Sequence, residues 1–116
     1  MADSGETAEA SAAFRSLAAE FPRDGAIQEA YARLLSEQSD RESLATALIK
    51  WRALEKGSPA GAPRWFRAKY AIALVHYRLG DRRQAAKLIT LLQLLRPDLG
   101  GPEMKRKFED LLRDCR

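Results

Sequence analysis

Residues able to act as a nucleophile, a general base or a metal ligand are few in this sequence. Its 116 residues include one histidine, His76, and one cysteine, Cys115. His76 lies inside an apolar stretch, where a structural histidine is more common than a catalytic one, because catalysis also needs a partner and a pocket. Cys115 is the penultimate residue, and an incidental thiol or a small apolar residue explains it equally well. A single cysteine also excludes an internal disulfide.

The glycine-containing stretches do not match phosphate-binding loops. GSPAGAP (57–63) and LGGP (99–102) lack the Gly-Lys-Ser/Thr ending and do not follow a predicted strand. No cysteine or histidine spacing suits a metal site. We therefore expect no enzyme activity, no cofactor and no small-molecule substrate.

Composition limits the remaining choices. A hydrophobic content of 46% over this length suits a single domain. No apolar run approaches the roughly 20 residues that span a bilayer, and the acidic start MADSGETAEA is unlike a signal peptide. The formal net charge of +4 favours an anionic partner only mildly. Localisation stays open.

Helical patterning runs through the whole sequence. Valine and isoleucine are scarce, and no stretch alternates with period two, so we expect an all-α fold. Stretches rich in proline, glycine and serine divide the chain into six predicted helices. They cover residues 6–20, 25–38, 41–56, 63–79, 82–96 and 102–115. Pro63 and Pro102 suit first helical turns, and Gly80 suits a left-handed residue that ends one helix before Asp81 caps the next.

A repeated pattern precedes Pro22, Pro59 and Pro97. Each proline follows an alanine, a large apolar residue and a leucine at the same three spacings. These residues are Ala10, Phe14 and Leu17; Ala47, Trp51 and Leu54; and Ala85, Ile89 and Leu92. Small residues allow close approach of helices and large ones fill the adjacent space, so the pattern indicates stacked helix pairs.

This pattern resembles the tetratricopeptide repeat. Residues 66–97 match best. Ile72 and Ala73 lie in the first helix, Gly80 lies at the turn, and the second helix carries Ala85, Ile89 and Leu92 and ends at Pro97. The resemblance implies antiparallel helix pairs stacked as a short right-handed α-solenoid. It divides the single domain 1–116 into a half repeat (6–22), two repeats (25–59 and 63–97) and a C-terminal capping helix (102–115). It also implies an inner groove that binds a partner.

The two ends of the predicted stack differ. One stripe of the last helix is apolar, which suits a cap, and the basic run 105–107 lies off that stripe. Nothing comparable covers the first helix, so its apolar residues should be partly uncovered. We therefore also consider that the chain is the C-terminal piece of a longer solenoid, or that it forms a homodimer through this helix.

Helical spacing places a mixed cationic and aromatic face on the predicted helix 63–79. Together with the matching positions of the preceding repeat, this face defines the candidate groove. Its residues are Arg33, Ser36, Arg67, Tyr70, Leu74, Tyr77 and Arg78. We expect Arg67 and Arg78 to point to water and to bind carboxylates, and the tyrosines to cover apolar side chains. Alternatively, Tyr70 and Tyr77 fill a seam between helices.

The sequence thus favours a non-catalytic scaffold that binds a protein or peptide, an acidic one in particular. A second hypothesis is nucleic-acid or other polyanion binding through the basic surface, although acidic residues interrupt the cations. A third is a purely structural role as the end-piece of a longer solenoid.

Overall fold

Six α-helices make up the fold in the computed structural model, which describes residues 4–116 and contains no strand within them. The helices are α1 (Ser4–Glu20), α2 (Gly25–Ser36), α3 (Arg41–Gly57), α4 (Pro63–Arg78), α5 (Arg82–Leu95) and α6 (Pro102–Asp114). Each helix end lies within two residues of its predicted position. The all-α prediction is confirmed.

Local capping explains several of these helix boundaries. Three aspartates precede helices and accept a hydrogen bond from a backbone N–H of the first turn, which would otherwise have no partner. They are Asp24 (from the Ile27 N–H, 3.1 Å), Asp40 (from the Ser43 N–H, 2.9 Å) and Asp81 (from the Gln84 N–H, 3.1 Å). Pro63 and Pro102 open α4 and α6 as predicted. Gly80 has φ +91°, the positive value that closes α4 before α5.

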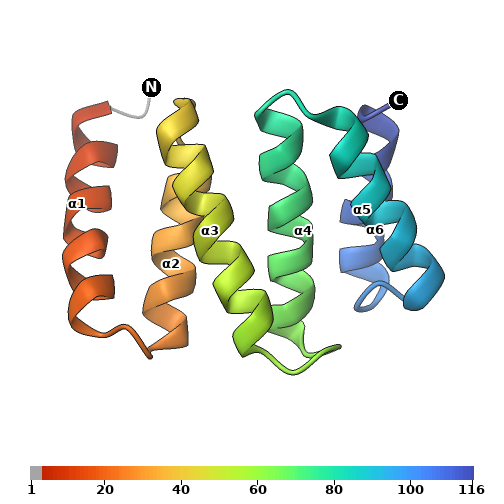
Figure 1. The fold of residues 1–116 in the computed structure, drawn as a ribbon, viewed down its shortest axis with the longest axis horizontal. Helices are drawn as coiled ribbons and strands as arrows, with labels where there is room; N and C mark the ends of the chain where they lie inside the picture. The colour runs from red at the N-terminus through yellow and green to blue at the C-terminus, as the bar shows by residue number, and fades with distance from the viewer. Residues whose placement is uncertain (1–3) are drawn as a thin grey trace.

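The helices follow one another along the longest axis of a molecule of 39 × 30 × 21 Å, and each packs against the next (Figure 1). α1 lies at one end, and α5 and α6 lie at the other, where α6 contacts both α4 and α5. Within residues 4–116, no helix has the length and apolar character needed to cross a bilayer.

The buried side chains form two clusters, and α4 contributes to both. The first contains residues of α1, α2, α3 and α4, among them Trp51, which is 3% exposed. The second joins α4, α5 and α6 and contains Phe108, which is 1% exposed. α4 is therefore the element through which the two halves of the molecule are packed together.

Burial follows the sequence pattern in two of its three copies. The alanine, the large apolar residue and the leucine are all buried in α3 and in α5. In the first copy Phe14 packs against the core, but Leu17 is 37% exposed, and Phe21 just after α1 is 45% exposed. The apolar side of α1 is thus partly uncovered, as the sequence predicts.

Candidate interaction groove

One hollow of about 270 Å³ collects most of the predicted groove residues. Six of the seven line it: Arg33, Ser36, Arg67, Tyr70, Leu74 and Arg78. The rest of the lining comes from Trp51 of α3, from Ala71 of α4, from Met104 and Lys107 of α6, and from Glu37, which follows α2. The hollow is therefore lined mainly by α2, α4 and α6, and α3 contributes Trp51.

The lining separates into apolar and charged parts. Aromatic and aliphatic groups supply the apolar part. They are Trp51, Tyr70, Ala71, Leu74 and Met104. Four cations, Arg33, Arg67, Arg78 and Lys107, surround them, whereas Glu37 is the single acidic residue of the lining. This arrangement can bury an apolar side chain and pair with carboxylates in the same ligand.

Beside the hollow, one buried carboxylate organises three arginines. Glu29 of α2 is 6% exposed. Arg67 grips it with two hydrogen bonds, from Nε to Oε2 at 2.7 Å and from Nη2 to Oε1 at 3.0 Å. Arg33 reaches Oε2 at 3.0 Å, and Arg64 reaches Oε1 at 3.1 Å. Because three positive charges surround one negative charge, this surface stays cationic. The hydrogen bonds to Glu29 also hold the three guanidinium groups in place.

The hydrogen bonds of this cluster shift the acid–base equilibria of its members. The bonds from Arg67, followed by those from Arg64, lower the pKa of the Glu29 carboxyl below its ordinary value, although burial acts in the opposite direction. The same contact with Glu29 raises the pKa of Arg67. Glu29 is therefore ionised at neutral pH, and the cluster is a set of charge-assisted hydrogen bonds.

A second polar network holds the ends of α2 and α4 together. The Trp51 indole Nε1 donates to Ser36 Oγ at 2.8 Å, and that hydroxyl donates to the Ala32 carbonyl at 2.8 Å. Arg78 donates from Nη1 to the Ser36 carbonyl. Because this carbonyl belongs to the last residue of α2, the guanidinium also lies at the negative end of that helix.

The two predicted groove tyrosines have different surroundings. Tyr70 lines the hollow and also packs edge-on against Phe108 of α6, with ring centroids 5.5 Å apart. Burial raises the pKa of its phenol, and Asp110 and Asp114 raise it further. Tyr77 does not line the hollow. It packs against the second cluster, and the guanidinium of Arg82 lies 5.5 Å from its ring centroid. Tyr77 therefore lies in a seam between helices, the alternative position considered for it from the sequence.

Arg67 and Arg78 both keep contact with water, as expected: Arg78 is exposed, and the Arg67 side chain is 41% exposed. Both also donate to protein acceptors, which the sequence did not predict, so reversing their charge would disrupt contacts between α2 and α4 as well as any binding. The structure places Lys107, which belongs to the basic run 105–107 off the apolar stripe of the last helix, in the lining of the hollow.

Sequence reasoning missed the Glu29 cluster and the contribution of α6. The only local signal was the spacing of Glu29 and Arg33, four residues apart on one helix face. Arg64 and Arg67 come from α4, and their approach to Glu29 depends on how α4 packs beside α2. Met104 belongs to the apolar stripe of the last helix, and that stripe indicates a cap without indicating a groove.

His76 and Cys115 are both partly buried. His76 Nε2 is buried without a hydrogen-bond partner in the described part of the chain, and burial, more than Arg52, lowers the pKa of its imidazole. Burial likewise raises the pKa of the Cys115 thiol, which reduces its thiolate fraction. No group of three or more His, Cys, Asp or Glu residues among those described is placed to hold a metal ion.

Comparison with protein-family models, with curated proteins and with solved structures gave no match to this chain in any of the three.

Proposed function

We propose that this chain is a non-catalytic interaction module of the tetratricopeptide-repeat type, a short right-handed α-solenoid that binds a peptide or helix carrying acidic residues. The observation that carries the proposal is the composition of the hollow between α2, α4 and α6, where four cations surround an apolar floor and one acidic residue is present. Such a surface suits a segment that alternates carboxylates with apolar side chains.

The cations of the groove differ in how freely they can engage a ligand. Arg67 and Arg78 are committed to Glu29 and to the end of α2. Arg33 also donates one hydrogen bond to Glu29, but its side chain is 60% exposed, and Lys107 is exposed as well, so these two are the more available pair. They come from α2 and α6, which places them on different sides of the hollow. We therefore assign first contact with a ligand's carboxylates to Arg33 and Lys107.

Selection from a peptide library displayed on phage tests this assignment and does not require the partner to be identified first. Peptides enriched by the intact protein should carry acidic residues beside large apolar ones. Their affinity for Arg33→Gln/Lys107→Gln should fall at least about tenfold, equivalent to about 1.4 kcal/mol, because two charge-assisted contacts are removed.

The matched control is Lys105→Gln/Arg106→Gln, which removes the same charge from exposed positions of α6 outside the hollow. Affinity should be nearly unchanged in this variant. Equal weakening in both variants would show that the partner reads net charge, which favours the nucleic-acid or polyanion alternative. A fluorescent oligonucleotide that binds at about 0.15 M salt would point the same way.

A further inference from the structure

A second hollow lies away from the groove, between the end of α1, the start of α2 and α3. Its volume is about 540 Å³. Three cations line it, and none of its lining residues is acidic. The residues are Ala18, Ala19, Pro22, Arg23, Gly25, Gln28, Lys50, Ala53, Leu54, Gly57, Ser58 and Arg64. A concave surface of one sign concentrates its electrostatic potential and so attracts the opposite charge.

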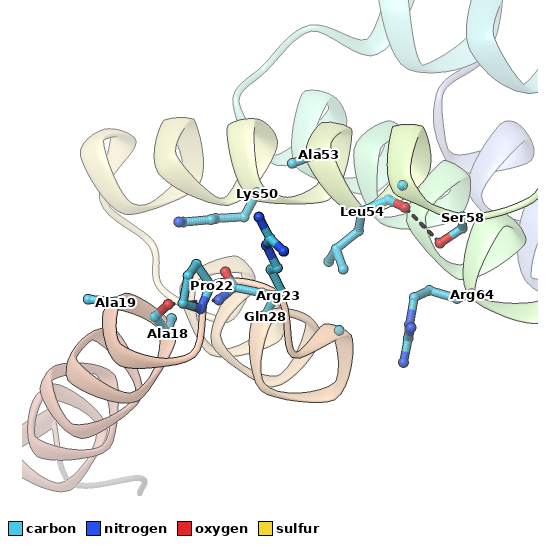
Figure 2. A pocket seen from close by; sticks show the side chains of 12 residues that line it. Ala18, Ala19, Pro22, Arg23, Gln28, Lys50, Ala53, Leu54, Ser58 and Arg64 are labelled. Atoms are coloured by element: carbon cyan, nitrogen blue, oxygen red, sulfur yellow. Dashed lines mark hydrogen bonds between the residues drawn. The ribbon is translucent and has the colours of Figure 1, made fainter.

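The cations reach this hollow from three different segments. Arg23 belongs to the α1–α2 turn and extends toward α3, where Lys50 lies, whereas Arg64 enters from α4 on the other side (Figure 2). Among the side chains that the structure describes, no carboxylate pairs with Arg23 or Lys50. The ammonium of Lys50 lies 5.7 Å from the centroid of the Tyr31 ring. Two cations therefore face the hollow with their charge uncompensated.

The neutral polar residues of the hollow are already engaged. The Gln28 amide nitrogen donates to the carbonyls of Ala18 and Phe21, at 2.9 and 3.1 Å. The Ser58 hydroxyl donates to the Leu54 carbonyl at 2.7 Å, as the dashed line in Figure 2 marks. These bonds hold the walls in place, so the cationic groups are the donors that remain for a ligand.

Arg64 is positioned by its contacts on both sides. Its Nε donates to Glu29 at 3.1 Å. Its guanidinium also lies so close over Gly25 that a Cβ at that position would be 2.4 Å from Nη1. Glycine at the start of α2 therefore makes room for this cation, and Glu29 prevents it from turning freely into solvent.

From these observations we propose that the hollow lined by Arg23, Lys50 and Arg64 is a binding site for a phosphate group carrying at least two negative charges. Phosphate oxygens accept charge-assisted hydrogen bonds from guanidinium and ammonium groups, and Arg23, Lys50 and Arg64 offer such groups on different walls of the hollow (Figure 2). The hollow is open to solvent, so the phosphate can be free or carried by a larger molecule. This site is separate from the proposed peptide groove.

Isothermal titration calorimetry with inorganic tripolyphosphate, at constant ionic strength, tests the site. The wild type should bind, and Arg23→Gln/Lys50→Gln should lose at least about tenfold in affinity, whereas Lys105→Gln/Arg106→Gln should retain it. Without ligand, the melting temperature of Arg23→Gln/Lys50→Gln should not fall below that of the wild type, because the substitution removes cations of like charge that face one hollow.

Ala53→Glu provides a second variant that leaves the cations intact. Ala53 is exposed on α3 and lines the hollow, so glutamate there should abolish binding while α3 stays folded. One further ligand, a phosphopeptide, identifies the source of the phosphate. A peptide with one phosphoserine that competes with tripolyphosphate would indicate a phosphate carried on a chain, and binding of tripolyphosphate alone would indicate a free polyphosphate.

Three results would overturn the proposal. One is absence of tripolyphosphate binding by the wild type. Another is equal weakening in the hollow variant and in the Lys105/Arg106 control, which would indicate a net-charge effect. The third is equally tight binding of citrate, since a site that does not distinguish carboxylates from phosphates is not a phosphate site. None of these results depends on whether the α2–α4–α6 groove binds a peptide.

Discussion

Glu29 shows how a single buried carboxylate joins two helices. It is nearly inaccessible to water, and all three of its arginine partners are partly exposed. Removing one partner from such a cluster leaves charges that have lost water without gaining a counter-charge. The stability of the α2–α4 contact therefore depends on the acid more than on any single arginine.

Glu29→Gln should reduce the free energy of unfolding by about 1–3 kcal/mol, because three guanidinium groups then face one another without a counter-charge. The exposure of the arginines keeps the loss below that of a fully buried cluster. Urea unfolding followed by circular dichroism measures the change. Glu109→Gln on the exposed side of α6 is the control and should shift stability by less than about 0.5 kcal/mol. Equal effects of the two substitutions would contradict the role assigned to Glu29.

The lowered pKa of Glu29 predicts how this contribution depends on pH. In the folded state the carboxylate stays ionised at pH values below its ordinary pKa of 4.5. As pH falls, Glu29 therefore becomes protonated in the unfolded state before it does so in the folded state. The difference in stability between the wild type and Glu29→Gln should be constant above that value and should shrink as pH falls below it. Comparison with the variant cancels the titration of the other carboxylates. A difference that grows on acidification would show the opposite shift.

At the scale of the helices, three consecutive residues determine the turn between α4 and α5. Leu79 is the C-cap residue after α4, Gly80 takes a positive φ, and Asp81 is the N-cap residue of α5. This turn sets the antiparallel return of α5 along α4. Its geometry therefore depends on a backbone conformation that most side chains disfavour.

Gly80→Val should lower the free energy of unfolding by about 1–3 kcal/mol, since a β-branched residue is strained at φ +91°. The site itself is open, and a Cβ there would meet no atom within 4 Å, so backbone conformation alone causes the loss. Gly57→Ala is a matched comparison, because Gly57 also has open space but lies in helical conformation. That substitution should be neutral or slightly stabilising. The same thermal melt for both variants would contradict this assignment.

Helix boundaries were predictable because their signals are local in sequence. Pro63, Pro102, Gly80 and the capping aspartates act within one turn of where they stand. Helical spacing determines which side chains share a face, and six of the seven candidate residues do line one hollow. Tyr77 does not line it, because it packs against the second cluster and beside Arg82 of α5. The charge cluster at Glu29 joins residues far apart in sequence, so no spacing rule identifies it.

For the whole molecule, the sharing of α4 between two clusters predicts cooperative unfolding. Ile72 and Val75 of this helix pack into the first cluster, and Phe66 and Ala73 pack into the second. Loss of either cluster exposes part of α4 and weakens the other. A molecule built in this way should unfold in one transition despite having two separate groups of buried side chains.

The two tryptophans allow a direct test of this coupling. Trp51 reports the first cluster, and Trp65 packs at the edge of the second. In Trp51→Phe and in Trp65→Phe, the urea midpoint from the remaining tryptophan should coincide with the midpoint from far-ultraviolet circular dichroism of that variant. Two separated midpoints in either variant would show that the halves of the molecule unfold independently.

Gly25 has a consequence for how this sequence can vary among related chains. A methyl group at position 25 would displace the end of a flexible arginine, so the backbone would tolerate the change, and the lost contact would be the one between Arg64 and Glu29. Positions 25, 29 and 64 are thus coupled although they lie on two helices. We expect relatives with a larger residue at position 25 to lack the arginine at position 64 or the acid at position 29, and an alignment of relatives would reveal this covariation.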